Sequence, residues 1–427
     1  MKPHLVIQFD KPLEGMLPSW QAFVSDKSVV CDRTGTPIDG VMRKYAQDVF
    51  VTLEYTPKAG EWSDEEIAAG LNRYYRIILR DTTQIPDGLI NDIRLHSDVI
   101  SVRPPGFFST SLRPFSYPST TMSRRLRHEM LNHLDPDLQG SRNITIAVLD
   151  TGVNAQHPEL DHTGGGGFDF VDILDGADAF VGDYLGPDAE PSDEVGHGTH
   201  VAGIIAGKGR SMPPGIAPRC KILPVRVLGA FQNEDGVVGA GLLENIDAGI
   251  KYAIDQGAEI INMSLGIRHE GGGLPHEEVI RYARSKGTTI VAAAGNDGRN
   301  QKYYPGANPY VIAVGAGGEE EDVAGFSTYG AHVSVVAPGT NIYSSYGTDE
   351  YAYSSGTSQA APFVSGCLAI LKTAAAHKGV TLSDNQMKYL IKHTSDKVSN
   401  RIKDIKAGYG HINIQDALRL LNYKIRH

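Results

Sequence analysis

From about residue 141 onwards, short apolar segments alternate with longer segments of helical character. The strand candidates are 144–149, 222–227, 259–263, 289–294 and 311–316. The helix candidates between them are 198–208, 239–256 and 275–286. Parallel strands need long crossover connections of this kind, and the helices then cover both faces of the sheet. The sequence therefore predicts an α/β domain with a doubly wound parallel sheet over residues 141–427.

The first 105 residues show a different pattern. Strand candidates at 48–53, 74–79 and 99–102 alternate with helix candidates at 63–71 and 87–95. This order is typical of the split βαβ unit, so residues 1–105 are predicted to hold a small α+β, ferredoxin-like domain. Residues 1–45 give no assignable pattern. Residues 106–140 are turn-rich and then basic, which fits either a plain linker or a processing region.

The segment Ser-Ser-Gly-Thr-Ser-Gln-Ala-Ala-Pro at 354–362 places a hydroxyl at a turn before a long, almost uncharged run. A serine hydroxyl is a poor nucleophile, so it needs a base and a third group that orients the base. His197 lies between two glycines, and Asp150 ends an apolar strand candidate, where functional groups gather in open α/β sheets. Ser358, His197 and Asp150 are therefore candidates for nucleophile, base and orienting acid.

The chain order Asp150, His197, Ser358 is one of the known orders of such a triad. The blocks around these residues resemble those of the subtilisin-like serine proteases, or subtilases. Further matching blocks are Asn-Met-Ser-Leu-Gly at 262–266, Ala-Ala-Ala-Gly-Asn at 292–296 and Gly-Tyr-Gly-His-Ile-Asn at 408–413. The resemblance covers residues 140–420 and implies a serine endopeptidase, a hydrolase that forms an acyl-enzyme intermediate. One departure is Gln359, where the family usually has methionine.

The resemblance also assigns residues to the binding of substrate. Asn296 matches the asparagine of the oxyanion hole, and the Ser358 amide would be the second donor. Tyr303 matches the floor of the first specificity pocket, but a surface tyrosine in a loop fits the sequence equally well. The residues expected to contact the peptide through strand edges or pocket walls are Ser264, Leu265, Gly266, Gly236, Ala293, Ala294 and Gly295.

Subtilases are typically made as zymogens with an amino-terminal propeptide of this small α+β kind. The resemblance therefore implies that residues 1–105 act as an intramolecular inhibitor. The segment around Pro104 to Ser111 is then expected in or near the substrate cleft.

No cofactor is required for this chemistry, and no histidine or cysteine spacing indicates a catalytic metal. Many subtilases hold a structural calcium ion in the loop that follows the helix of the catalytic histidine. Here the corresponding loop, 207–215, has two basic residues and no carboxylate. Because calcium requires oxygen ligands, this site is predicted to be absent. Glu159 leaves calcium binding elsewhere open.

Composition limits the other function classes. A net charge of −10 argues against a nucleic-acid-binding surface. The apolar run 360–376 contains Pro362 and Lys372, so a buried helix is expected and no membrane span. The three cysteines are far apart and are interpreted as small apolar residues.

The first ten residues lack the long apolar run of a secretory signal, which predicts a cytoplasmic protein. The alternative is a secreted protein whose signal was trimmed. Two alternatives to peptide hydrolysis also remain at this stage. One is a noncatalytic binding module on the same fold, and the other is a transpeptidase or peptide cyclase. The protein or peptide substrate is not identified by the sequence.

Overall fold

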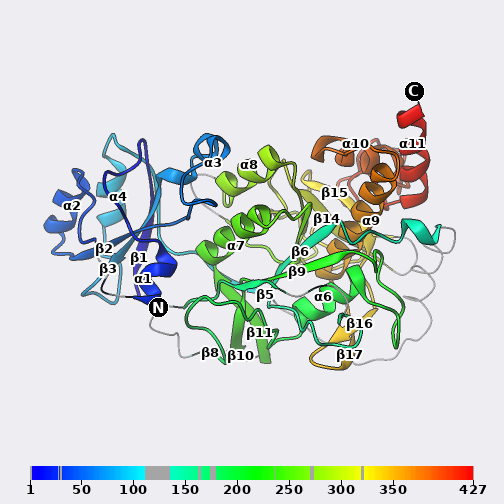
Figure 1. The fold of residues 1–427 in the computed structure, drawn as a ribbon, viewed down its shortest axis with the longest axis horizontal. Coiled ribbons are helices and arrows are strands. Elements are labelled where there is room, and N and C mark those ends of the chain that lie inside the picture. The colour runs from blue at the N-terminus through cyan, green and yellow to red at the C-terminus, as the bar shows by residue number, and fades with distance from the viewer. Residues whose placement is uncertain are drawn as a thin grey trace.

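The computed structural model describes residues 2–26, 28, 31–110, 135–161, 164, 166–173, 179–234, 236–269, 274–318 and 322–426. Two separate sheets dominate these residues, a four-stranded one in the amino-terminal part and a seven-stranded one in the rest (Figure 1). The part of the processing region at 111–134 lies outside the described residues.

The seven strands of the large sheet are all parallel and have the order β15-β14-β13-β12-β6-β9-β7. Their bounds are β6 Thr145–Asp150, β7 Phe168–Asp169, β9 Lys221–Arg226, β12 Ile260–Met263, β13 Thr289–Ala293, β14 Ile312–Gly317 and β15 Val333–Pro338. The chain starts in the middle of the sheet at β6 and extends it in both directions. This arrangement confirms the predicted doubly wound parallel sheet.

Helices cover both faces of this sheet. One core lies between the sheet and the helices α6 (His197–Ala206) and α9 (Thr357–Ala376), and α10 (Asp384–Thr394) and α11 (Ile414–Arg426) extend it. The other core lies beneath α7 (Leu243–Asp255) and α8 (Glu277–Lys286). Neighbouring residues of β6 therefore face opposite cores: Ile146 and Val148 belong to the first, and Ala147 and Leu149 to the second.

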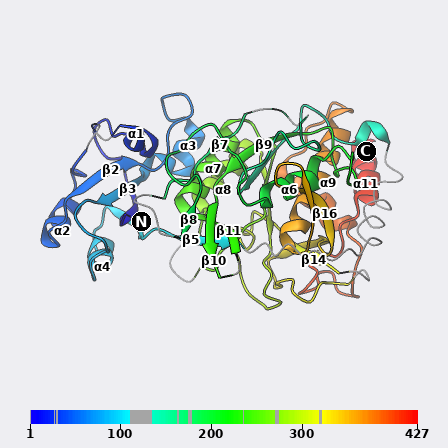
Figure 2. The same cartoon turned by 90° about the horizontal axis from the view of Figure 1, so that it is seen from below.

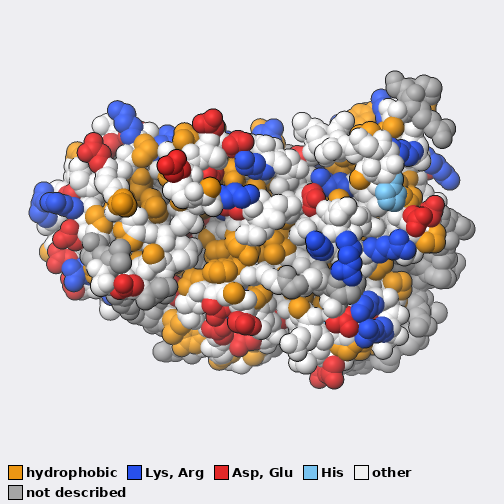
Figure 3. Space-filling view, in the orientation of Figure 1, with side chains coloured by type: hydrophobic (Ala, Val, Ile, Leu, Met, Phe, Trp, Pro, Cys, Tyr) orange, Lys and Arg blue, Asp and Glu red, His pale blue; other side chains and the backbone are white. Residues whose placement is uncertain are grey.

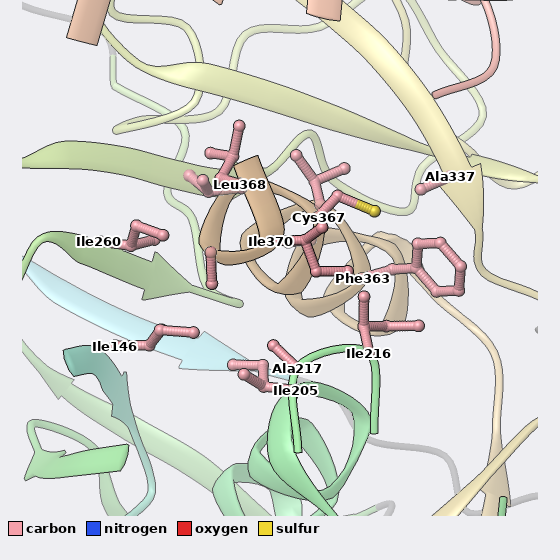
Figure 4. Close-up of a cluster of buried hydrophobic side chains, with 14 of the residues drawn as sticks. Ile146, Ile205, Ile216, Ala217, Ile260, Ala337, Phe363, Cys367, Leu368 and Ile370 are labelled. Carbon is pink, nitrogen blue, oxygen red and sulfur yellow. The ribbon is translucent and has the colours of Figure 1, made fainter. Parts of the chain in front are cut away.

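Helix α9 is the centre of the first core. Almost every residue from Thr357 to Ala375 is buried, which is why this run is nearly uncharged. Figure 4 shows Phe363, Cys367 and Ile370 of this helix among side chains from the strands and from the segment after α6. Among the described residues, no helix is long and apolar enough to cross a membrane.

The amino-terminal sheet is antiparallel and has the order β2-β3-β1-β4. Its strands are β1 His4–Phe9, β2 Val49–Leu53, β3 Tyr74–Leu79 and β4 Val99–Arg103. Its short helices are α1 Trp20–Ser25, α2 Ile38–Lys44, α3 Asp64–Ala69, η1 Leu71–Arg73 and α4 Leu89–Arg94. The unassigned first residues supply β1, which lies between β3 and β4 and is almost wholly buried.

This amino-terminal part contacts the rest of the molecule mainly through α7 and α8 (Figures 1 and 2). Tyr55, Ala69 and Leu71 are buried in the same apolar cluster as the side chains of α7 and α8. Ion pairs surround this cluster: Arg103 contacts Glu244 and Asp247, and Lys251 contacts Glu66 at 2.7 Å. Apolar packing and charge pairing together fix the two parts against each other.

A third sheet connects the two parts. It has the antiparallel order β5-β11-β10-β8, with β5 Phe107–Thr110, β8 Phe180–Val181, β10 Gly229–Asn233 and β11 Gly236–Leu242. The predicted helix 239–256 is therefore wrong in its first four residues, which continue β11. The apolar residues Gly239 to Leu242 fit either a helix or a strand, and their pairing with the distant strand β10 stabilises the strand.

A hairpin of β16 (Ile342–Tyr346) and β17 (Glu350–Ser354) precedes α9, and η2 (Pro136–Leu138) precedes β6.

Candidate active site

Asp150 and His197 form a buried pair at the junction of two elements. Asp150 is the last residue of β6 and His197 the first of α6, and both side chains are almost fully buried. The Nδ1 atom of His197 lies 2.5 Å from Oδ1 of Asp150, which also accepts the Thr151 amide at 2.8 Å. Burial lowers the pKa of His197, but the Asp150 carboxylate outweighs burial and the net pKa is raised.

Asp193 fixes the start of the histidine helix. Its carboxylate accepts bonds from the amides of Val195, Gly196 and Thr199 and from the hydroxyls of Thr151 and Thr199, at 2.6 to 3.1 Å. Such bonds satisfy amides that have no partner at a helix amino terminus. The sequence analysis gave Asp193 no role, because it stands three residues before the cap position, Gly196, where no capping pattern points to it. Burial raises the pKa of its carboxyl despite these bonds.

Ser358 is the second residue of α9, and an internal proline shapes its surroundings. Pro362 has no amide hydrogen, so the Ser358 carbonyl lacks its usual helical donor four residues later. The Ser264 hydroxyl donates to this carbonyl instead, at 2.8 Å. The Ser358 hydroxyl donates back to the Ser264 carbonyl at 3.1 Å. These two bonds hold the start of α9 against the segment that follows β12.

A buried polar chain supports Ser264 from behind. The Asn262 side-chain amide donates to the Ser264 hydroxyl at 3.0 Å, and the Ser365 hydroxyl donates to the Asn262 carbonyl oxygen at 2.8 Å. All three side chains are fully buried. Each of these hydrogen bonds satisfies a group that would otherwise be costly to bury.

Asn296 is oriented by Thr357. Its Oδ1 accepts the Thr357 amide at 2.8 Å and the Thr357 hydroxyl at 3.0 Å, while that hydroxyl accepts the Gly295 amide at 3.1 Å. Because an amide hydrogen requires an oxygen acceptor, these bonds assign which side of the Asn296 group is Oδ1. The Nδ2 donor then lies on the other side. The chain turns at Gly295, whose φ of +106° favours glycine.

A pocket of about 200 Å³ brings Ser358 and Asn296 together with most of the predicted peptide-contacting residues. Leu265, Gly266, Ala293 and Gly295 line it, as does Ser264. Two predicted residues lie elsewhere among the described residues. Ala294 is fully buried and its amide bonds to the Val314 carbonyl, and Gly236 begins β11.

Tyr303 lines the same pocket and is held by two charged side chains. Its hydroxyl donates to Asp297 at 2.5 Å and accepts from Arg268 Nε at 3.1 Å, and Arg268 also pairs with Asp297 at 2.5 Å. A β-carbon on Gly295 would lie 2.6 Å from the Tyr303 ring, so the ring takes up space beside this turn. The hydrogen bond from Tyr303 lowers the pKa of Asp297, and the Arg268 charge acts in the same direction.

Gln359 follows the serine and is almost completely buried. Its Nε2 atom has no hydrogen-bond partner among the described residues. A buried amide without a partner is costly, so Gln359 is an unfavourable choice on grounds of stability alone.

The loop 207–215 uses its backbone amides to bind a carboxylate of the chain itself. Glu159 is fully buried, and it accepts the amides of Gly209, Arg210 and Ser211 at 2.6 to 3.1 Å. Amide hydrogens aimed at one carboxylate do not suit calcium, which requires converging oxygens. The residues of this loop therefore do not fit the ion. The described residues contain no cluster of three or more histidine, cysteine or acidic side chains that could hold a metal.

β5 runs antiparallel to β11, with Thr110 opposite Gly239 and Phe107 opposite Leu242. The Phe107 ring contacts Phe180 and Phe231 edge-on, with centroid distances of 6.1 and 5.5 Å. Figure 3, drawn in the orientation of Figure 1, shows an apolar area at the middle of the visible face. This area lies over the region where Figure 1 places α7, β5 and β11. β5 therefore occupies one edge of β11, the strand that begins at Gly236.

Comparison with known proteins agrees with this geometry. Residues 141–410 match the model of the subtilase family. A thermophilic serine proteinase from Bacillus sp. (strain AK1) is 40% identical over 66% of this chain, which spans 63% of that protein. Thermitase from Thermoactinomyces vulgaris is 39% identical over 62% of this chain and 85% of its own length.

A solved structure supports the same conclusion. The protease domain of PatA, in a serine-to-alanine mutant, superposes with a TM-score of 0.57 and 27% identity, covering 68% of this chain and 99% of that domain. Sequence and fold agree over the parallel sheet and its helices. The chain belongs to the subtilase family of serine proteases.

Proposed function

We propose that the chain is a serine endopeptidase in which Ser358 attacks the peptide carbonyl, His197 is the general base and Asp150 orients the imidazole. The observation that carries this proposal is the buried 2.5 Å contact between His197 Nδ1 and Asp150 Oδ1. This contact fixes the proton on Nδ1 and leaves Nε2 as the basic nitrogen. It also stabilises the imidazolium that forms when the serine gives up its proton.

The reaction would start with rotation of the Ser358 hydroxyl away from the Ser264 carbonyl. His197 Nε2 takes the proton as the serine oxygen bonds to the carbonyl carbon, and then gives that proton to the leaving amine. Water attacks the resulting acyl-enzyme by the same route. The Asn296 Nδ2 donor and the Ser358 amide stabilise the oxyanion. As an amide in the first turn of α9, the Ser358 N–H has no intrahelical acceptor.

Hydrolysis of casein and labelling by a serine-directed phosphonate test this proposal together. Ser358→Ala is expected to lose nearly all turnover, roughly a million-fold, and to remain unlabelled. Asn296→Ala should lose roughly a hundred- to a thousand-fold in kcat with KM little changed. Ser285→Ala, on the exposed side of α8, is the matched control.

Three outcomes would contradict the proposal. Substantial turnover in Ser358→Ala would remove the nucleophile assignment. If the chain neither cleaves casein nor is labelled, it is a noncatalytic binding module. Labelling with joined rather than shortened peptides, detected by mass spectrometry, would indicate a transpeptidase or cyclase.

We further propose that the chain is made as a zymogen and that residues 1–105 act as its intramolecular inhibitor. Support comes from the pairing of β5 with β11, because the strand that would receive an extended peptide is partly taken by the chain itself. The ion pairs of Arg103 and the cluster around Leu71 would hold β5 in place.

Comparison of the full chain with a version beginning near residue 125 tests the inhibitor role. The shorter chain should cleave peptides faster, and added fragment 1–120 should suppress it. Ser358→Ala should accumulate as full-length protein if processing is autocatalytic. Equal rates for both chains, with no effect of the fragment, would leave the amino-terminal part as a structural appendage.

A further inference from the structure

A second cavity, of about 480 Å³, lies between α10 and the segments that flank β14 and β15. It shares no lining residue with the pocket that holds Ser358. Its volume lies within the range of small-molecule sites in proteins. The basic residues that line it are Lys302, Lys388, Lys392, Lys403 and His332. We call this cavity the lysine pocket.

No carboxylate is among the residues that line the lysine pocket. Lys388 is paired with Asp384 at 2.7 Å, at the start of its own helix. Lys403 donates to a neutral acceptor, the Ala331 carbonyl, at 2.6 Å. For Lys302 and Lys392, the described part of the chain provides no acidic partner within ion-pair distance. Among the described residues, the pocket therefore has more positive charge than neighbouring acids neutralise.

Tyr409 brings these charges close together. The Nζ atoms of Lys392, Lys397 and Lys403 lie 5.1, 5.4 and 5.2 Å from the centroid of its ring. A ring face attracts a cation by roughly 0.5–1 kcal/mol at exposed sites, which does not replace a counter-ion for three ammonium groups. Lys397 uses backbone carbonyls of Ile402 and Tyr409 as acceptors.

The titration of the lining groups reflects this crowding. Burial lowers the pKa of His332 to about 4, and the charges of Lys302 and Lys403 act in the same direction. Burial also lowers the pKa of Lys403, and Lys392 adds to that effect. Neutral His332 has a buried Nε2 atom without a partner among the described residues. A bound anion would offset each of these unfavourable features.

The rest of the lining is mixed: Asn308 and Ser334 are polar, and the apolar residues include Val311, Ile312, Val335 and Ile391. A ligand that fits this cavity therefore combines a concentrated negative charge with room for a small apolar part. No carboxylate of the described residues lines the pocket, and phosphate oxygens match clustered lysines well. We propose that the lysine pocket binds a small phosphate-class anion, either inorganic or a phosphate monoester.

Binding can be measured on the full chain carrying Ser358→Ala, which prevents self-digestion. Pyrophosphate and phenyl phosphate are titrated separately by calorimetry, with sodium chloride adjusted to hold ionic strength constant. We expect saturable binding of at least one probe at one site per chain, with a matching rise in melting temperature. Tighter pyrophosphate binding would indicate an inorganic ligand, and tighter phenyl phosphate binding an ester.

The double variant Lys392→Gln, Lys403→Gln tests the location. It should weaken binding by about tenfold or more, because two charge-assisted hydrogen bonds are lost. Without a probe its melting temperature should be close to that of the parent, because removal of two like charges offsets the lost bond to the Ala331 carbonyl and the contacts with the Tyr409 ring. The control Lys11→Gln, Lys221→Gln makes the same charge change at exposed positions and should bind like the parent.

If the double variant does not fold, Lys302→Gln on the exposed loop replaces it, with several-fold weaker binding expected. The proposal is overturned if neither probe binds saturably at 10 mM, or if the pocket and control variants bind alike. It is also overturned if the pocket variant loses stability without any probe, because the lysines would then be structural.

Discussion

At the scale of single residues, the environment of His197 would decide the pH range in which the proposed reaction proceeds. A buried imidazole is normally less basic, but here the Asp150 carboxylate at 2.5 Å reverses the effect of burial. Asp193 adds a second negative charge at the start of the same helix. As the proposed catalytic base, His197 is therefore predicted to be charged, and inactive, over a wider pH range than a free histidine.

We predict that kcat/KM of the processed chain rises with pH and reaches its half-maximum above 6.5, the ordinary histidine value. The sign follows because the base must be neutral, and a raised pKa moves its deprotonation to higher pH. Hydrolysis of a neutral peptide over pH 5 to 10 measures this. A half-maximum below 6.5 would mean that burial, and not Asp150, controls the imidazole.

Tyr303 is predicted to restrict the side chain that precedes the cleaved bond. Tyr303→Gly removes the ring from the pocket and should raise the kcat/KM ratio of phenylalanine over alanine substrates by roughly tenfold or more. Tyr303→Phe keeps the ring and is the matched control, with the parent's preference expected. A preference that stays the same in Tyr303→Gly would place the limit of the pocket elsewhere.

Gln359→Met should stabilise the protein. The change keeps the length of the side chain and removes the buried Nε2 group, which has no partner among the described residues; this is worth roughly 1–3 kcal/mol. Urea unfolding in the Ser358→Ala background measures the difference. Gln256→Met, at an exposed position, should change stability by less than about 0.5 kcal/mol. A loss of stability in Gln359→Met would show that the amide has a role that the buried contacts do not reveal.

At the scale of elements, Pro362 makes the start of α9 depend on a different part of the chain. Its missing amide leaves the Ser358 carbonyl to the Ser264 hydroxyl, and Ser264 in turn is held by Asn262 of β12. Ser358, the proposed nucleophile, is thus held by the central sheet as well as by its own helix. In a helix without this proline, the amide of residue 362 would donate to the Ser358 carbonyl, and the bond from the Ser264 hydroxyl would no longer be needed.

A double-mutant cycle tests this dependence. Ser264→Ala should destabilise the protein by roughly 1–3 kcal/mol, because the Ser358 carbonyl and the Asn262 amide both lose a partner. In a Pro362→Ala background the loss should be about 1 kcal/mol smaller, since the new amide can donate to the carbonyl. Strict additivity of the two changes would refute the coupling.

The elements that could be predicted from sequence are those whose pattern is local. Strands β6, β9, β12, β13 and β14 follow apolar runs, and their ends agree with the expected ones within a residue or two. The first part of 239–256 was predicted wrongly because its strand is fixed by pairing with distant β10. β1 was missed because the short run His4–Phe9 becomes a strand only between β3 and β4.

The same distinction holds for the candidate site. Asp150, His197, Ser358 and Asn296 stand in recognisable blocks, so their positions could be named from the sequence. The supporting roles of Asp193, Thr357 and the Ser264 hydroxyl depend on contacts between segments far apart in the chain. The side chains around Tyr303 also come from separate loops, so only the structure could decide that it lines the pocket.

At the scale of the whole molecule, Arg103 lies where the amino-terminal part meets α7. It contacts Glu244 and Asp247, whose side chains are almost fully buried. The His276 ring also contacts Asp247, at 2.5 Å, so this carboxylate connects α7, the start of α8 and β4. Removal of the arginine would leave Glu244 and Asp247, two buried acids one turn apart on α7, without this cation.

Arg103→Ala is expected to loosen this junction. Loss of the charged hydrogen bonds should cost roughly 1.5–3 kcal/mol of stability, and the full chain should cleave a short peptide faster than the parent. Arg43→Ala, at an exposed position on α2, should change neither property. If Arg103→Ala lowers stability without faster cleavage, the arginine holds the amino-terminal part in place but the contact does not inhibit the enzyme.

Because Tyr55, Ala69 and Leu71 share one apolar core with α7 and α8, a cut in the chain would not by itself separate the two parts. A cut turns an internal contact into an equilibrium between two molecules, and its position then depends on how dilute they are. In freshly cut protein at high concentration, the two parts would stay bound and the enzyme inactive. Activity would appear on dilution or when the smaller part is digested. The bare faces of α7 and α8 would then meet water for the first time, which makes the freed enzyme prone to self-association.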